Sequence, residues 1–118
     1  MSVKIKGLNS WKKWINSIPD ELMEKIQEDV YKTATDIEQD AKANAPVDSG
    51  DLRRSINIEM EMESRGLQAQ IGTNMEYATN VEFGDSRQNA QPYLIPAYNQ
   101  YSPDLDKRLR KSLKDVFD

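Results

Sequence analysis

The feature that most constrains the fold is a long amphipathic helix pattern that runs from Pro19 to Ala43. Apolar residues recur at intervals of three or four, and charged residues fill most positions between them. The apolar positions are Leu22, Ile26, Val30, Ala34 (or Thr33), Ile37 and Ala41. Such a helix would be roughly 35 Å long at 1.5 Å per residue. In a chain of 118 residues, a helix of this length must pack along a sheet, along another helix or along another chain.

The helix pattern ends in the stretch 41–55, which reads AKANAPVDSGDLRRS and forms a corner of the chain. Pro46 stops the helix, because a proline cannot donate a backbone hydrogen bond and pushes the preceding residue out of the helical region. Short polar residues and Gly50 then supply turn chemistry, since glycine adopts positive φ without strain. We expect an extended run to begin at Leu52.

Residues 52–63 and 66–73 alternate between apolar and polar side chains, which predicts two strands joined as a hairpin. The apolar face of the first strand carries Ile56, Ile58, Met60 and Met62, and that of the second carries Leu67, Ala69 and Ile71. Both apolar sets must lie on one side of the sheet, and a slip of one residue would reverse one of them. The predicted pairs are Met62 with Leu67 and Met60 with Ala69. This register requires a connection of two or four residues.

The N-terminal part of the chain has two weaker patterns. Residues 1–8 alternate in part and predict a short edge strand, which lysines would protect from further pairing and which Gly7 would break. Residues 9–18 have the spacing of a short amphipathic helix that carries Trp11 and Trp14. These tryptophans either cover the main core or dock onto a neighbouring subunit, because tryptophan is enriched at interface hot spots.

The C-terminal half begins with the stretch 74–84, which fits either a short helix or an irregular turn and ends at Gly84, a helix terminator. A polar loop follows at 85–91. We expect 92–96 to be extended because prolines bracket it, and we expect a helix over 97–118, at least from Pro103. Apolar residues of this last helix repeat every four positions, at Tyr101, Leu105, Leu109, Leu113 and Phe117. Two ion pairs are expected along it, Asp104 with Arg108 and Asp106 with Arg110.

These elements predict an α+β fold. A long N-terminal helix and a C-terminal helix should pack on a small antiparallel sheet built around the hairpin. The length falls within the usual range for one domain, so residues 1–118 are expected to form a single domain.

The composition removes most catalytic chemistry. The chain contains no cysteine and no histidine, so it lacks thiol chemistry and the commonest general base and metal ligand. Residues 84–86 resemble a serine-nucleophile block, but no histidine is present to accept the proton. Glu59, Glu61 and Glu63 lie too far apart along a strand to bind one ion without a third element, so a solvated face is the simpler interpretation. We therefore predict no catalytic residue, no metal site and no cofactor.

Charge and hydropathy limit the possible partners. The net charge of −4 is unlike that of a dedicated nucleic-acid binder. Basic residues gather on the last helix, at Lys107, Arg108, Arg110, Lys111 and Lys114. They form either a solvated helix face or a surface for phosphate contact. No apolar run approaches the ~20 residues of a membrane span, so we expect no membrane partner and synthesis in a cytoplasm.

An ordered set of short motifs resembles the small neck or tail-completion proteins of long-tailed bacteriophages and prophages. The motifs are AKANAP, SGDLRRSI, EYATNVEFG and QPYLIPAY, followed by an amphipathic helix. The stretch departs from the family pattern at Ser49 and at Asp85, where threonine is common.

The resemblance implies a non-enzymatic structural protein at the head–tail connection of the virion, assembled in the host cytoplasm. Its partners would be copies of itself in a ring, neighbouring neck or tail proteins, and passing DNA without sequence recognition. The interface candidates are Trp11, Trp14, Tyr77, Glu82, Phe83, Tyr93, Leu94 and Tyr98, and the structural turn residues are Pro46, Gly50 and Gly84. The alternative is a prophage-encoded soluble adaptor or inhibitor that binds a host protein.

Overall fold

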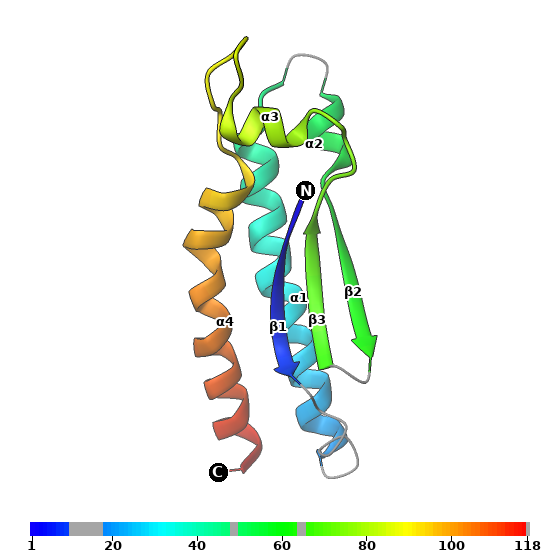
Figure 1. The fold of residues 1–118 in the computed structure, drawn as a ribbon. Coiled ribbons are helices and arrows are strands. Elements are labelled where there is room, and N and C mark those ends of the chain that lie inside the picture. The colour runs from blue at the N-terminus through cyan, green and yellow to red at the C-terminus, as the bar shows by residue number, and fades with distance from the viewer. Residues whose placement is uncertain (10–17, 48–49, 64–65, 118) are drawn as a thin grey trace.

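Two long antiparallel helices pack together and cover one face of a three-stranded sheet (Figure 1). The computed structural model describes residues 1–9, 18–47, 50–63 and 66–117. The elements are β1 (Ser2–Asn9), α1 (Asp20–Asn44), α2 (Asp51–Ser55), β2 (Asn57–Glu63), β3 (Gly66–Gly72), α3 (Ala78–Phe83) and α4 (Leu94–Phe117). The molecule measures 54 × 25 × 20 Å, and α2 and α3 lie together at one end of its long axis. This arrangement confirms the predicted α+β fold.

The sheet has the strand order β1-β3-β2, with β1 and β2 both antiparallel to β3. Met62 lies opposite Leu67 and Met60 lies opposite Ala69. The predicted hairpin register is therefore confirmed, with two residues between the last paired positions. β1 is an edge strand, as expected, because it pairs with β3 alone in the described sheet.

The prediction that Gly7 breaks β1 is wrong, because the strand continues through it to Asn9. The pairing with β3 shifts its register between Lys6 and Leu8. A Cβ atom at Gly7 would lie 2.6 Å from Cγ2 of Val30 on α1. Glycine is needed here because the helix approaches the strand too closely for a side chain.

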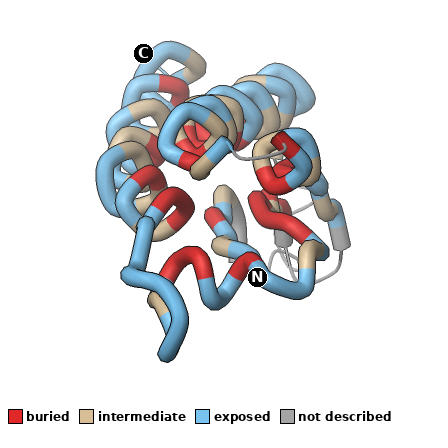
Figure 2. The backbone as a smooth tube through the Cα atoms, turned by 90° about the horizontal axis from the view of Figure 1, so that it is seen from above, coloured by how far each residue is buried: buried red, intermediate tan, exposed pale blue. Residues whose placement is uncertain are grey.

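The core lies between the helix layer and the sheet, where buried segments gather in Figure 2. α1 contributes the expected stripe to this core, and no buried side-chain polar atom of the described residues lacks a partner. The buried positions of the stripe are Leu22, Ile26, Val30, Thr33, Ala34, Ile37 and Ala41. The amphipathic period of this helix was therefore a reliable guide to its packing.

The expected extended run from Leu52 is instead the short helix α2, and β2 begins only at Asn57. The helical turn places Leu52 and Ile56 in the same core, where both are almost completely buried. It also brings Arg53 back to α1, so that its Nε donates to the carbonyl oxygen of Lys42 at 2.9 Å. That carbonyl lies in the last turn of α1, which leaves its final carbonyls without helical partners.

The expectation of an extended 92–96 segment is also wrong, because α4 begins at Leu94. Pro96 lies in the first helical turn, where a missing N–H removes no hydrogen bond of the helix. The helix expected from Ala97 forms and begins three residues earlier, with Pro103 inside it.

The apolar repeat of α4 faces the core only in its first part. Leu105 is buried, whereas Leu113 is 45% exposed and Phe117 is 65% exposed. A row at intervals of four drifts by about 40° per step around a helix of 3.6 residues per turn. Ser112 therefore takes the buried position, and its hydroxyl donates to Asp29 on α1 at 2.5 Å.

One of the two ion pairs expected along α4 forms. Arg110 and Asp106 pair at 2.8 Å on the exposed face. Arg108 does not use Asp104 as predicted; it donates to Asp36 at 2.9 Å and to the hydroxyl of Thr33 at 2.8 Å. Arg108 binds α1 rather than its own helix because α1 presents the carboxylate of Asp36 and the hydroxyl of Thr33 at the same point of the helix interface.

The contact at Gly7 gives a stability prediction. We expect Gly7→Ala to lower the free energy of unfolding by about 1–3 kcal/mol, because the new methyl group overpacks the contact with Val30. The measurement is urea denaturation followed by circular dichroism. In a chain that also carries Val30→Ala, the added cost of Gly7→Ala should be smaller, and equal costs in the two backgrounds would contradict the steric explanation.

Candidate functional site

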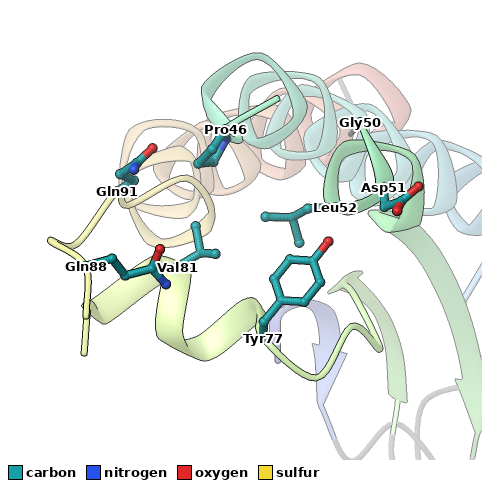
Figure 3. Close-up of a pocket in the computed structure, with 8 residues that line it drawn as sticks. All are labelled: Pro46, Gly50, Asp51, Leu52, Tyr77, Val81, Gln88 and Gln91. Carbon is teal, nitrogen blue, oxygen red and sulfur yellow. The ribbon is translucent and has the colours of Figure 1, made fainter. Parts of the chain in front are cut away.

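A pocket of about 410 Å³ opens at the end of the molecule where α2 and α3 lie (Figure 3). Its lining residues are Pro46, Gly50, Asp51, Leu52, Tyr77, Val81, Gln88 and Gln91. They come from two stretches that are far apart in the sequence: the corner after α1, and residues 77–91, which contain α3 and the 85–91 loop. The two motif-rich stretches of the chain therefore meet at one surface.

The first wall is the corner between α1 and α2. α1 ends at Asn44, and Ala45 caps it with an N–H that donates to the carbonyl of Ala41 at 2.9 Å, before Pro46. Gly50 has a φ of 81°, a conformation that glycine adopts without steric cost. It precedes α2, so the pocket wall turns sharply and Leu52 points inward (Figure 3).

The second wall is α3. The ring of Tyr77 lies across the pocket from α2, with its hydroxyl towards the Leu52 side (Figure 3). The helix ends at Gly84, which has a φ of 78° and whose N–H donates to the carbonyl of Asn80 at 2.8 Å. A Cβ atom at Gly84 would lie 2.7 Å from the backbone nitrogen of Ala90, so both the turn and the close approach favour glycine.

The 85–91 loop completes the pocket and is held by its own polar groups. The carboxylate of Asp85 accepts from the N–H groups of Arg87 at 2.8 Å and Gln88 at 3.0 Å. The N–H of Gln91 donates to the carbonyl of Val81 at 2.8 Å. These contacts bring the side chains of Gln88 and Gln91 to the pocket rim.

Behind the pocket, the carboxylate of Glu82 holds the start of α4. It accepts from the N–H groups of Tyr93 at 3.2 Å, Leu94 at 2.9 Å and Ile95 at 3.4 Å. Glu82 is only 2% exposed, and a buried charge is tolerated when such donors replace water. The negative carboxylate also complements the positive end of the helix dipole.

Tyr93 lies directly beside this cap and is fully buried. Burial raises the pKa of its phenol from 10.0 to about 12, with further contributions from the negative charge of Glu82 and from Tyr77. The phenol is therefore neutral at physiological pH and belongs to the packing of the site.

The structure separates the interface candidates into two groups. Tyr77 and Phe83 are exposed near the pocket, and Tyr98 is half-buried on α4. Glu82, Tyr93 and Leu94 are instead buried within the chain's own fold. Trp11 and Trp14 lie outside the described residues. The interface role of all these residues stays a prediction.

Sequence reasoning missed the pocket residues Leu52, Gln88 and Gln91. The sequence pattern places Leu52 in an extended run and the two glutamines in a polar loop, and neither position indicates a pocket. The only available signal was the order of the motifs, because no local period predicts that the 85–91 loop folds back against the corner. The approach of Gln88 and Gln91 to Pro46 and Leu52 is set by the tertiary fold.

The pocket offers aromatic, aliphatic and amide groups, which suit contact with another protein surface. No group of three or more carboxylates gathers at a possible metal site within the described ranges. Glu61 on the open sheet face hydrogen-bonds to Gln68 of β3. In the described part of the chain, no helix is apolar and long enough to span a membrane.

A match to a family model places the chain among bacteriophage tail components. Residues 11–84, more than half of the chain, match the model of the HK97-gp10-like family, which is described as "Bacteriophage HK97-gp10, putative tail-component". The chain belongs to this family. Its matched region contains the corner, the hairpin and α3, and ends at Gly84.

One curated relative is an uncharacterized protein of Methanocaldococcus jannaschii, which is 34% identical over 67 residues. The match covers 55% of this chain and 50% of the relative, so the chain spans about half the length of that protein. No solved structure matches the chain.

The cap at the start of α4 can be tested by Glu82→Gln. We expect this change to lower the free energy of unfolding by about 1.5–3 kcal/mol, because an amide cannot accept three N–H groups and loses the charge-assisted bonds. Urea denaturation measures the loss, and amide hydrogen exchange should quicken at Leu94 and Ile95. Glu76→Gln, on an exposed neighbouring residue, serves as the control, and equal effects of the two changes would disprove the cap.

The raised pKa of Tyr93 gives a pH prediction. Between pH 10 and about 12 the unfolded chain loses the phenol proton while the folded chain keeps it, so the stabilisation is complete below pH 10 and is lost as pH rises. The free energy of unfolding should fall by up to about 1.4 kcal/mol per pH unit from this group. Tyr93→Phe should remove that part of the slope in alkaline urea titrations, whereas Tyr31→Phe, on an exposed residue, should leave it unchanged.

Proposed function

We propose that this chain is a non-enzymatic structural protein at the head–tail connection of a phage particle, where it assembles with copies of itself into a ring. The observation that carries the proposal is the family match, whose residues 11–84 include six of the eight residues that line the pocket. The chain would act in the virion through contact surfaces and would require no cofactor. Residues 1–118 would work as a single domain.

The shape of the molecule supports assembly through its flanks. A ring needs heterologous contacts, in which one surface of a copy binds a different surface of the next copy. The long axis of the molecule places α4 on one flank and β2 on the other (Figure 1). The exposed Tyr77 and Phe83 lie at the end of the molecule that carries α2 and α3, which we call the motif end. A neighbouring neck or tail protein would bind there.

The open face of the sheet supports a passive role toward DNA. Lys4 and Lys6 of β1 are exposed, as is Glu59 of β2, while Glu61 is half-buried. This face pairs with no other element in the described structure, and its acidic strand would favour sliding over binding if it lined the lumen. Sequence-specific readout would need a different surface.

The test is electron microscopy of phage particles produced without this chain. We expect full heads and separate tails to accumulate, because the connection is missing, and we expect joined particles to return when the wild-type chain is supplied in trans. Joined, infectious particles that never contain the polypeptide would disprove the proposal. A purified monomer that captures one host protein would instead favour the adaptor or inhibitor alternative.

A further inference from the structure

A second hollow, the α1/β2 groove, lies on the flank of the molecule away from α4. Its lining residues are Glu24, Gln27, Glu28, Tyr31, Met60, Met62 and Leu67. The groove forms because α1 packs on all three strands whereas α4 packs chiefly on α1 and β1. The helix-facing side of β2 is therefore only partly covered.

The floor of the α1/β2 groove is apolar and its rim is acidic. Tyr31 is 55% exposed and Met62 is 51% exposed, although both belong to the faces that α1 and β2 turn towards one another. Glu24 and Glu28 lie one turn apart along the α1 side. The groove volume of about 540 Å³ falls within the range of about 300–1,000 Å³ of ligand-sized sites, which is enough to receive bulky apolar side chains.

The last turns of α4 have the opposite character. Leu113 and Phe117 are exposed and, being four residues apart, lie on the same face of the helix. Arg110, which pairs with Asp106 on the exposed face, and Lys114 flank them at the neighbouring helical positions, and both are exposed. This surface, the α4 end patch, is therefore apolar in its centre and basic at its border.

The groove is lined by α1 and by the end of β2, and the patch lies on the last turns of α4. In Figure 1 the end of β2 and the end of α4 lie on opposite flanks near the same end of the elongated molecule. We infer that the α4 end patch of one copy docks into the α1/β2 groove of the next copy, with Leu113 and Phe117 against the two methionines and the basic residues against the acidic rim. This inference names the contact of the ring proposed above and rests on that proposal. The acidic rim of the groove is complementary in charge to the basic border of the α4 end patch. We therefore expect a second copy of this chain to occupy the groove.

The contact is heterologous, so a pair of copies keeps one unused groove on one copy and one unused patch on the other, and further copies can add at both ends. Flexible methionines adapt to a docked aromatic ring and make favourable sulfur contacts with it. Copies joined in this way would stand with their long axes alongside one another, and the motif end carrying Tyr77 would remain available to a different protein.

The absence of cysteine allows a direct test by single-cysteine variants and a short bis-maleimide crosslinker. A mixture of Met62→Cys and Phe117→Cys, distinguished by a mass tag, should give a crosslinked heterodimer in at least about tenfold higher yield than Met62→Cys with Val47→Cys. Docked thiols meet at effective concentrations near millimolar, whereas undocked chains meet only by random encounter. Val47 is a matched control because it is also exposed but lies beyond the other end of α1. Equal yields in the two mixtures would overturn the inference.

A double variant, Met62→Cys with Phe117→Cys, distinguishes head-to-tail contact from a two-fold dimer. Crosslinking of the double variant should give a ladder of multimers, because every copy carries both thiols. If Met62→Cys alone instead gives mainly dimers crosslinked between the two copies of position 62, the inference is overturned. Particle assembly separates this result from the proposed function. If joined particles still form and contain the chain while the crosslink fails, the head–tail role stands and another surface makes the ring.

Discussion

The fold depends on the carboxylate of Glu82, which lies where α3 meets the first turn of α4. The first N–H groups of a helix have no acceptor within the helix and must find one elsewhere. Glu82 accepts from the N–H groups of residues 93–95, and Pro96 has no N–H to satisfy. The start of α4 is therefore complete only when α3 is folded beside it.

This contact makes two separate motifs into one structural unit. The Glu-Phe-Gly segment supplies the carboxylate and then ends α3 at Gly84, and the Pro-Tyr-Leu segment supplies the donors. The 85–91 loop between them is fixed by its two ends, with the N–H of Gln91 bound to α3. Tyr93 is buried beside this charge, and its burial and the negative charge of Glu82 both raise the pKa of its phenol, so packing and electrostatics act on the same group here.

The sequence predicted the elements whose side chains follow a simple period, and it failed where distant groups decide the structure. The stripe of α1 and the pairing of Met62 with Leu67 follow from periods of 3.6 and 2. The start of α4 could not be read from its own residues, because its acceptor lies twelve positions earlier, at Glu82. Gly7 was misjudged for a similar reason, since its need for a small residue arises from Val30 on another element.

The direction of α4 also determines what the molecule leaves uncovered. Starting beside α3, α4 runs back along α1 and over β1, and its last turns leave Leu113 and Phe117 exposed. Among the residues that the structure describes, no second helix covers the β2 side, and Met60 and Met62 are exposed on that flank. Because the two apolar surfaces lie on opposite flanks, the single interface of a two-fold dimer cannot cover both of them. Head-to-tail contacts that close by rotation cover both surfaces on every copy. The cap that begins α4 thus also creates the asymmetry from which a ring can be built.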